Sequence, residues 1–146
     1  MNSQENLINS KYHLSVVKRM YENYKTYEDK RFIVGIINEL AKSSSNMIKA
    51  YLIIEKDYSS NHLKNLKIFS NKVGPKYLDK KIIENILKSL EIQRAQKESP
   101  IEFSKEDKII FLINGKYKFL TLKRLEEFIN SVEIGILKLP KICRQI

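Results

Sequence analysis

The chain has 146 residues, of which 42% are hydrophobic and 30% are charged, a size and composition typical of one soluble domain. No apolar run reaches the roughly 18 residues that a membrane-spanning helix needs, and the polar residues 1–5 are unlike a signal peptide. The single cysteine, Cys143, cannot form an internal disulfide, so we expect a reducing, cytoplasmic setting.

The formal net charge is +10, and a basic protein attracts phosphate backbones. The basic residues are 22 lysines and 5 arginines, and the chain is also rich in isoleucine and asparagine. An AT-rich coding sequence produces the same mixture, and arginine is the better bidentate reader of phosphates and bases. Charge alone therefore leaves nucleic-acid binding and codon usage as two open explanations.

The scarcity of glycine and proline, with 4 and 3 residues, favours long helices. The first is expected over about residues 6–27, where apolar residues recur at spacings of three, four and seven. The second is expected over about 32–55, with apolar residues also off the main stripe, which predicts a central helix. Ser43-Ser44-Ser45 interrupts it. The serines indicate either a notch for a ligand or, as we favour, the close approach of a neighbouring helix.

Three further helices are expected along the rest of the chain. A short one runs from His62 to about Asn71, capped by Asn61 or Ser60. A long one covers about residues 76–97 and ends before Pro100. The last begins after the N-cap Thr121 and is expected to end at Pro140, which leaves a short basic tail over about 140–146.

A β-hairpin is predicted between the last two long helices, with strands at 108–113 and 116–120 around Asn114-Gly115. A two-residue turn fixes the pairs on each face. One face holds Leu112 with Tyr117 and Ile110 with Phe119, and it is expected to pack on the helices. The other pairs Ile113 with Lys116, Phe111 with Lys118, and Ile109 with Leu120. We expect Ile109, Phe111 and Ile113 to be covered by a helix of the same chain or by a second subunit, as interface residues.

These elements predict a mainly α fold and a single domain over residues 1–146. It is an antiparallel bundle of about four long helices and one short helix, with the hairpin at about 108–120 before the last helix. The sequence shows no internal repeat and no low-complexity linker.

No motif for a known reaction is present. Four glycines provide no phosphate-binding loop. His13, His62 and Cys143 lie far apart, so neither a metal site nor a cofactor is predicted. The best polar constellation is residues 91–98, where Arg94, Lys97 and Glu98 share a helix face. It is either a solvated helix end with one weak salt bridge or a partner surface. With the two hairpin lysines, the candidate RNA-binding residues are Arg94, Lys97, Lys116 and Lys118.

The long antiparallel helices, with an arginine-bearing polar turn near the end of the penultimate long helix, resemble the HEPN superfamily over about residues 6–140. The resemblance implies a small, dimeric, all-helical domain, and many such domains are metal-independent RNases or toxins. Their signature is an Arg followed four to six residues later by His. Arg94 is the candidate for that Arg, but no His stands at 98–101 or anywhere after His62. Because metal-independent RNA cleavage needs an imidazole, the resemblance implies a non-catalytic relative.

Three functions follow as hypotheses. The first is a non-catalytic binding or assembly module, homodimeric, that contacts RNA or a protein partner and needs no membrane or small-molecule cofactor. The second is a divergent HEPN-type ribonuclease or toxin using Arg94, Lys97 and Glu98. The third is a small basic helical subunit of a CRISPR-type nucleoprotein complex. The missing His favours a role without catalysis, and the enzyme question stays open.

Overall fold

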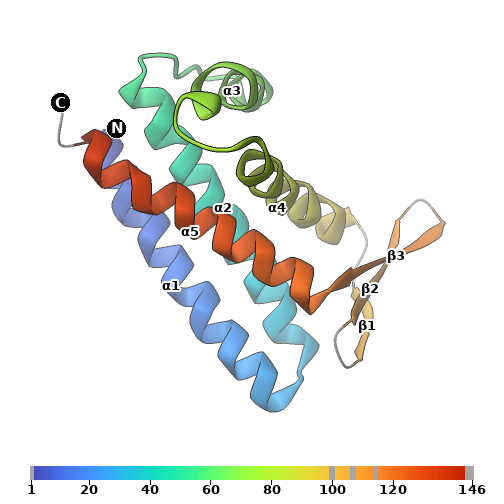
Figure 1. Cartoon of the computed structure of the whole chain (residues 1–146). Coiled ribbons are helices and arrows are strands. Elements are labelled where there is room, and N and C mark those ends of the chain that lie inside the picture. Colours follow the sequence, from blue (N-terminus) through green and yellow to red (C-terminus); the bar gives the residue numbers. More distant parts are fainter. Residues whose placement is uncertain (1, 99–100, 106–107, 114, 144–146) are drawn as a thin grey trace.

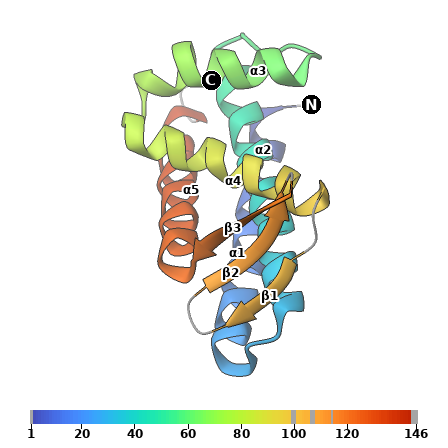
Figure 2. The ribbon, with the colours of Figure 1, turned by 90° about the vertical axis from the view of Figure 1, so that its right-hand side faces the viewer.

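A computed structural model describes the backbone of residues 2–98, 101–105, 108–113 and 115–143, and their side chains except those at 101–105, 111–113 and 140–143. The helices are α1 (Ser3–Tyr27), α2 (Lys30–Ile54), α3 (His62–Ile68), α4 (Lys80–Glu98) and α5 (Leu122–Cys143). The strands are β1 (Ile101–Lys105), β2 (Lys108–Ile113) and β3 (Lys116–Thr121). The predicted mainly α fold, with a hairpin before the last helix, is confirmed (Figures 1 and 2).

The two longest helices form an antiparallel pair with a very short connection. The Asn2 side chain caps α1 by accepting a hydrogen bond from the backbone N–H of Glu5 at 2.8 Å. Glu28 ends that helix in the left-handed conformation, with φ of 54°. The Asp29 carboxylate then caps α2 by accepting from the N–H of Arg31 at 2.9 Å. Local capping chemistry therefore sets both ends of this turn.

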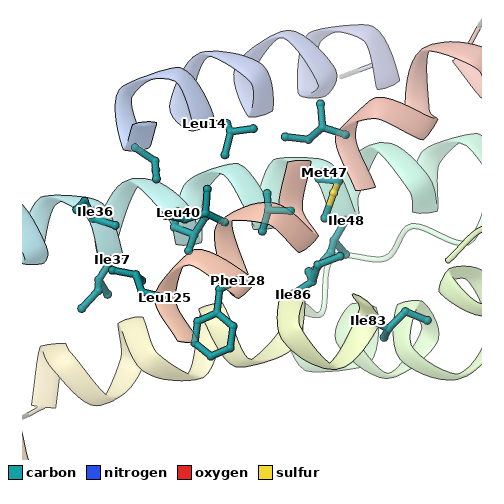
Figure 3. Close-up of a cluster of buried hydrophobic side chains, with 14 of the residues drawn as sticks. Leu14, Ile36, Ile37, Leu40, Met47, Ile48, Ile83, Ile86, Leu125 and Phe128 are labelled. Carbon is teal, nitrogen blue, oxygen red and sulfur yellow. The ribbon is translucent and has the colours of Figure 1, made fainter. Parts of the chain in front are cut away.

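Helix α2 lies at the centre of the bundle, as its all-round apolar pattern predicts. It packs against α1, α4 and α5, and its Ile36, Met47 and Tyr51 are fully buried. Figure 3 shows side chains of α1, α4 and α5 converging on it, including Leu14, Ile86 and Phe128. Burial of this apolar surface is the main source of stability for the bundle.

The serines of α2 lie at helix contacts. Ser43 Oγ donates to the Ser10 carbonyl at 2.9 Å, while Ser10 Oγ donates to the Ser43 carbonyl at 2.8 Å. One residue on, the hydroxyls of Ser44 and Ser89 are 2.8 Å apart. Small side chains allow the close approach of α1 on one side and α4 on the other, so the favoured interpretation of this serine run is confirmed for Ser43 and Ser44.

The short helical region is more broken than predicted. Asn61 caps α3 through the N–H of Lys64, but α3 ends at Ile68. A short π-helix at Phe69–Val73 and a short 3-10 helix at Gly74–Lys76 follow. Helix α4 then begins at Lys80, four residues later than expected. None of the helices in the described part of the chain is long and apolar enough to cross a membrane.

The sheet has the predicted hairpin register, with Leu112 opposite Tyr117 and Ile109 opposite Leu120. β1 adds a third antiparallel strand beside β2, which the sequence did not predict. The expected orientation of the hairpin was wrong. Ile109 and Leu120 are buried, with exposures of 0% and 6%, whereas Phe119 is 68% exposed. The face expected to pack on the helices therefore points away from them.

The cause lies in the junction between β3 and α5. Thr121 caps α5, its hydroxyl accepting from the N–H of Arg124 at 3.1 Å. The helix therefore begins directly after Thr121, and Leu120, the residue before this cap, is buried against the bundle. Because side chains alternate along a strand, Phe119 must then face outward.

The expected end of the last helix at Pro140 was also wrong, because α5 continues to Cys143. Proline removes one backbone donor from a helix but does not prevent it when packing holds the adjoining turn. Here Ile136 and Leu139 are both buried in the core. The predicted basic tail is therefore helical as far as residue 143, and residues 144–146 lie outside the described part.

Candidate nucleic-acid interface

Two aromatic side chains are displayed on one face of the sheet. Tyr117 and Phe119 of β3 are 66% and 68% exposed, and their alternate positions place them on the same face. Figure 1 shows β2 and β3 extending away from the helices, beside the first turn of α5. Exposure of two large rings side by side costs hydrophobic free energy, so it indicates a contact surface.

A lysine shares this face with the aromatic rings. Lys108 pairs with Thr121, so it stands diagonally opposite Phe119. Its Nζ lies 5.7 Å from the centre of the Phe119 ring, within the range of a cation–π interaction. We call the surface formed by Lys108, Tyr117 and Phe119 the sheet platform.

Two more lysines flank the platform on the same strand. Lys116 and Lys118 alternate with the aromatic residues, so they point to the opposite side of β3, and both are exposed. Neither these two nor Lys108 forms an ion pair with any side chain that the structure describes. Among the described side chains, no carboxylate therefore neutralises Lys108 on the face of the two rings, or Lys116 and Lys118 on the opposite face of β3.

Of the three residues predicted as an interface, the structure describes the side chain of Ile109 alone. Ile109 is fully buried within its own chain, so it cannot contact a partner without unfolding of the sheet. Phe111 and Ile113 have backbones paired with Lys118 and Lys116, and their side chains lie outside the described residues. The structure thus places Ile109 in the core.

The four candidate RNA-binding residues fall in different places. Lys116 and Lys118 lie on the hairpin beside the platform. Arg94 and Lys97 are exposed on α4 but line separate hollows: Arg94 a groove with α3, Lys97 a cleft with α2 and α3. Among the described side chains, Arg94 and Glu98 form no salt bridge. The polar constellation on α4 is therefore not a single site.

The platform residues Tyr117 and Phe119 were assigned to the core from the sequence. Both faces of the hairpin carry apolar residues, so alternation groups the side chains correctly but does not say which group faces inward. One signal was available. Thr121 was predicted to cap the last helix. Because that helix packs on the core, the residue before the cap, Leu120, is expected to face inward, and this places Phe119 on the outer face.

A groove between α1 and α5, of about 220 Å³, is less suited to an anionic ligand. Lys18 and Lys25 line it, but so do Glu22 and Glu126. Burial, followed by a hydrogen bond with Glu126, raises the pKa of Tyr21 to about 12, so this phenol stays neutral. In the part of the chain that the structure describes, no three His, Cys, Asp or Glu side chains come together as a metal site.

Comparison of the chain with protein-family profiles, with characterised proteins and with solved structures gave no match. The resemblance to the HEPN superfamily stays a prediction.

Proposed function

We propose that this protein is a non-catalytic module that binds single-stranded RNA on the sheet platform. The observation that carries the proposal is the pair of two-thirds-exposed rings, Tyr117 and Phe119, on one face with Lys108. Sequence-tolerant binding of single strands combines aromatic rings, on which bases stack, with cations along the backbone. Both parts are present on one short β-hairpin.

The geometry favours unpaired bases over a duplex. Residues two apart on one strand are separated by roughly 6.6 Å, so the two rings offer two neighbouring stacking surfaces. In a duplex the bases are stacked on each other, and their faces are not accessible to a protein side chain. Lys116 and Lys118, on the other side of β3, pair with no carboxylate that the structure describes and can contact phosphates of a strand that crosses the hairpin.

Two other uses of this surface remain as alternatives. A second copy of the chain or another protein would also bury Tyr117 and Phe119, as the homodimer hypothesis requires. A CRISPR-type subunit would combine RNA contacts with such a protein contact. The ribonuclease hypothesis gains no support from the platform, because neither a histidine nor a carboxylate is among its three residues.

The test is the affinity of the full chain for a labelled single-stranded RNA, measured by fluorescence anisotropy. Phe119→Thr removes the ring but keeps a residue that favours strands. We expect it to weaken binding by about 1–3 kcal/mol, roughly 5- to 150-fold. Tyr12→Ala removes a similarly exposed ring from α1 and is the matched control. Three phosphate-contacting lysines would give a salt slope of about −2.

The proposal is wrong if Phe119→Thr and Tyr12→Ala bind RNA equally well, or if a duplex binds as tightly as the single strand. Light scattering on the same samples separates the alternative. A dimer that dissociates on Phe119→Thr, with RNA affinity unchanged, would identify the platform as a protein interface.

A further inference from the structure

A second hollow of the molecule lies between α2, α3 and α4. Figure 1 shows α3 and α4 on the same side of α2. We call this hollow the α2–α4 cleft. The cleft is open to solvent and has a volume of about 450 Å³, within the range of small-molecule sites. Its lining consists of Asn38, Ala41, Lys42 and Ser45 from α2, His62 from α3, and Leu90, Gln93 and Lys97 from α4.

Among the side chains that the structure describes, the lining carries two lysines and one histidine and no carboxylate. Lys42, His62 and Lys97 come from three different helices and are all exposed to solvent. Lys97 and His62 form no ion pair with a side chain in the described ranges. The Lys97 ammonium and the His62 ring are therefore not engaged by any carboxylate that the structure describes.

Lys42 has one acidic neighbour outside the lining. Its Nζ lies 3.5 Å from Glu39 Oε1, while Glu39 Oε2 is 2.5 Å from His13 Nδ1. Glu39 thus divides its interactions between two partners, and its carboxylate is turned toward α1. A long, flexible lysine exchanges such a half-exposed contact for a phosphate at little cost.

The remaining lining residues suit the rest of a nucleotide. The amides of Asn38 and Gln93 stand on facing helices and offer both donors and acceptors. Ala41 and Leu90 supply apolar surface, and Leu90 is half-buried. A nucleotide combines these same features: an anionic phosphate, polar edges and an apolar ring face.

We propose that the α2–α4 cleft binds one nucleotide through its phosphate, with Lys42, His62 and Lys97 as the phosphate ligands. The nucleotide is either a free mononucleotide or the phosphorylated end of a strand, since the recognised chemistry is the same. The cleft shares no residue with the sheet platform. The proposal therefore stands or falls separately from the proposed function.

The experiment is isothermal titration of the full chain with AMP, adenosine and orthophosphate. AMP is expected to bind more tightly than either part, because adenosine lacks the phosphate and orthophosphate lacks the ring. A charged hydrogen bond contributes about 1.5 kcal/mol or more, so Lys97→Gln should weaken AMP binding about tenfold. His62→Gln, which removes the imidazole ring and its N–H donor, should also weaken AMP binding. The matched control is Lys88→Gln, an exposed lysine on α4 outside the cleft, which should leave binding unchanged.

A second arm identifies the source of the nucleotide. A short single-stranded RNA is compared with and without a terminal phosphate at either end. Tighter binding of the phosphorylated strand, lost in Lys97→Gln, supports recognition of a strand end. If neither AMP nor a terminal phosphate responds to Lys97→Gln more than to Lys88→Gln, the proposal is overturned. Phe119→Thr should leave AMP binding intact, and thermal melting verifies that each variant is folded.

Discussion

The orientation of the sheet can be tested by stability alone. Ile109 is fully buried between the sheet and the helices, and Phe119 is 68% exposed on the other face. Ile109→Ala removes buried methyl and methylene groups and leaves a cavity, which typically costs 2–5 kcal/mol. The sheet lies at the edge of the bundle, where neighbours can relax into the space, so we expect about 2–3 kcal/mol. Phe119→Thr should stay within about 0.5 kcal/mol of the parent, because little buried contact is lost.

Urea unfolding followed by circular dichroism measures the free energy of unfolding of both variants and the parent. An unchanged m-value shows that the differences in midpoint report differences in stability. For a chain of this size, a loss of about 2–3 kcal/mol lowers the melting temperature by roughly 5–10 °C. The reasoning is refuted if Ile109→Ala is as stable as the parent while Phe119→Thr is strongly destabilised. That result would restore the orientation expected from the sequence and remove the sheet platform.

Three further predictions concern the bundle. Ser44→Leu puts a branched side chain into the buried contact of α2 with α4 and should cost about 1–3 kcal/mol; an unchanged melting temperature would contradict the close approach. In Gly135→Ala the new methyl group would overlap the Met47 sulfur, so despite the better helix propensity of alanine we expect a lower urea midpoint. The hydrogen bond from the Tyr77 hydroxyl lowers the pKa of Glu55, with Lys76 contributing less. Its stabilising effect is present above the unfolded pKa, near 4.5, and is lost as pH falls through the folded value. Tyr77→Phe should therefore make the stability loss on acidification smaller, and an identical pH profile would contradict this.

Most of the helical architecture was predictable from local pattern. Apolar spacing located α1 and α2 to within a few residues, since a helix that buries one face must repeat every three or four positions. The all-round apolar character of α2 predicted its central place. Asn114-Gly115 fixed the hairpin register, because few other dipeptides accept the backbone of a two-residue turn. The end of α5 was not predicted correctly. A proline disfavours the helix locally, which suggested an end at Pro140, whereas the burial of Leu139 in the core is a tertiary effect that no local pattern contains.

The candidate sites depended on information that no local pattern contains. Alternation is a local property of a strand, so the residues that share a face of the hairpin could be predicted: Ile109 with Leu120, and Tyr117 with Phe119. Which face meets the helices could not be predicted locally, since both are apolar and the choice depends on where α5 leaves the sheet. The same holds for His62 and Lys97. They are separated by a turn region and most of α4, and a shared cleft between them exists only because α3 and α4 fold against the same side of α2.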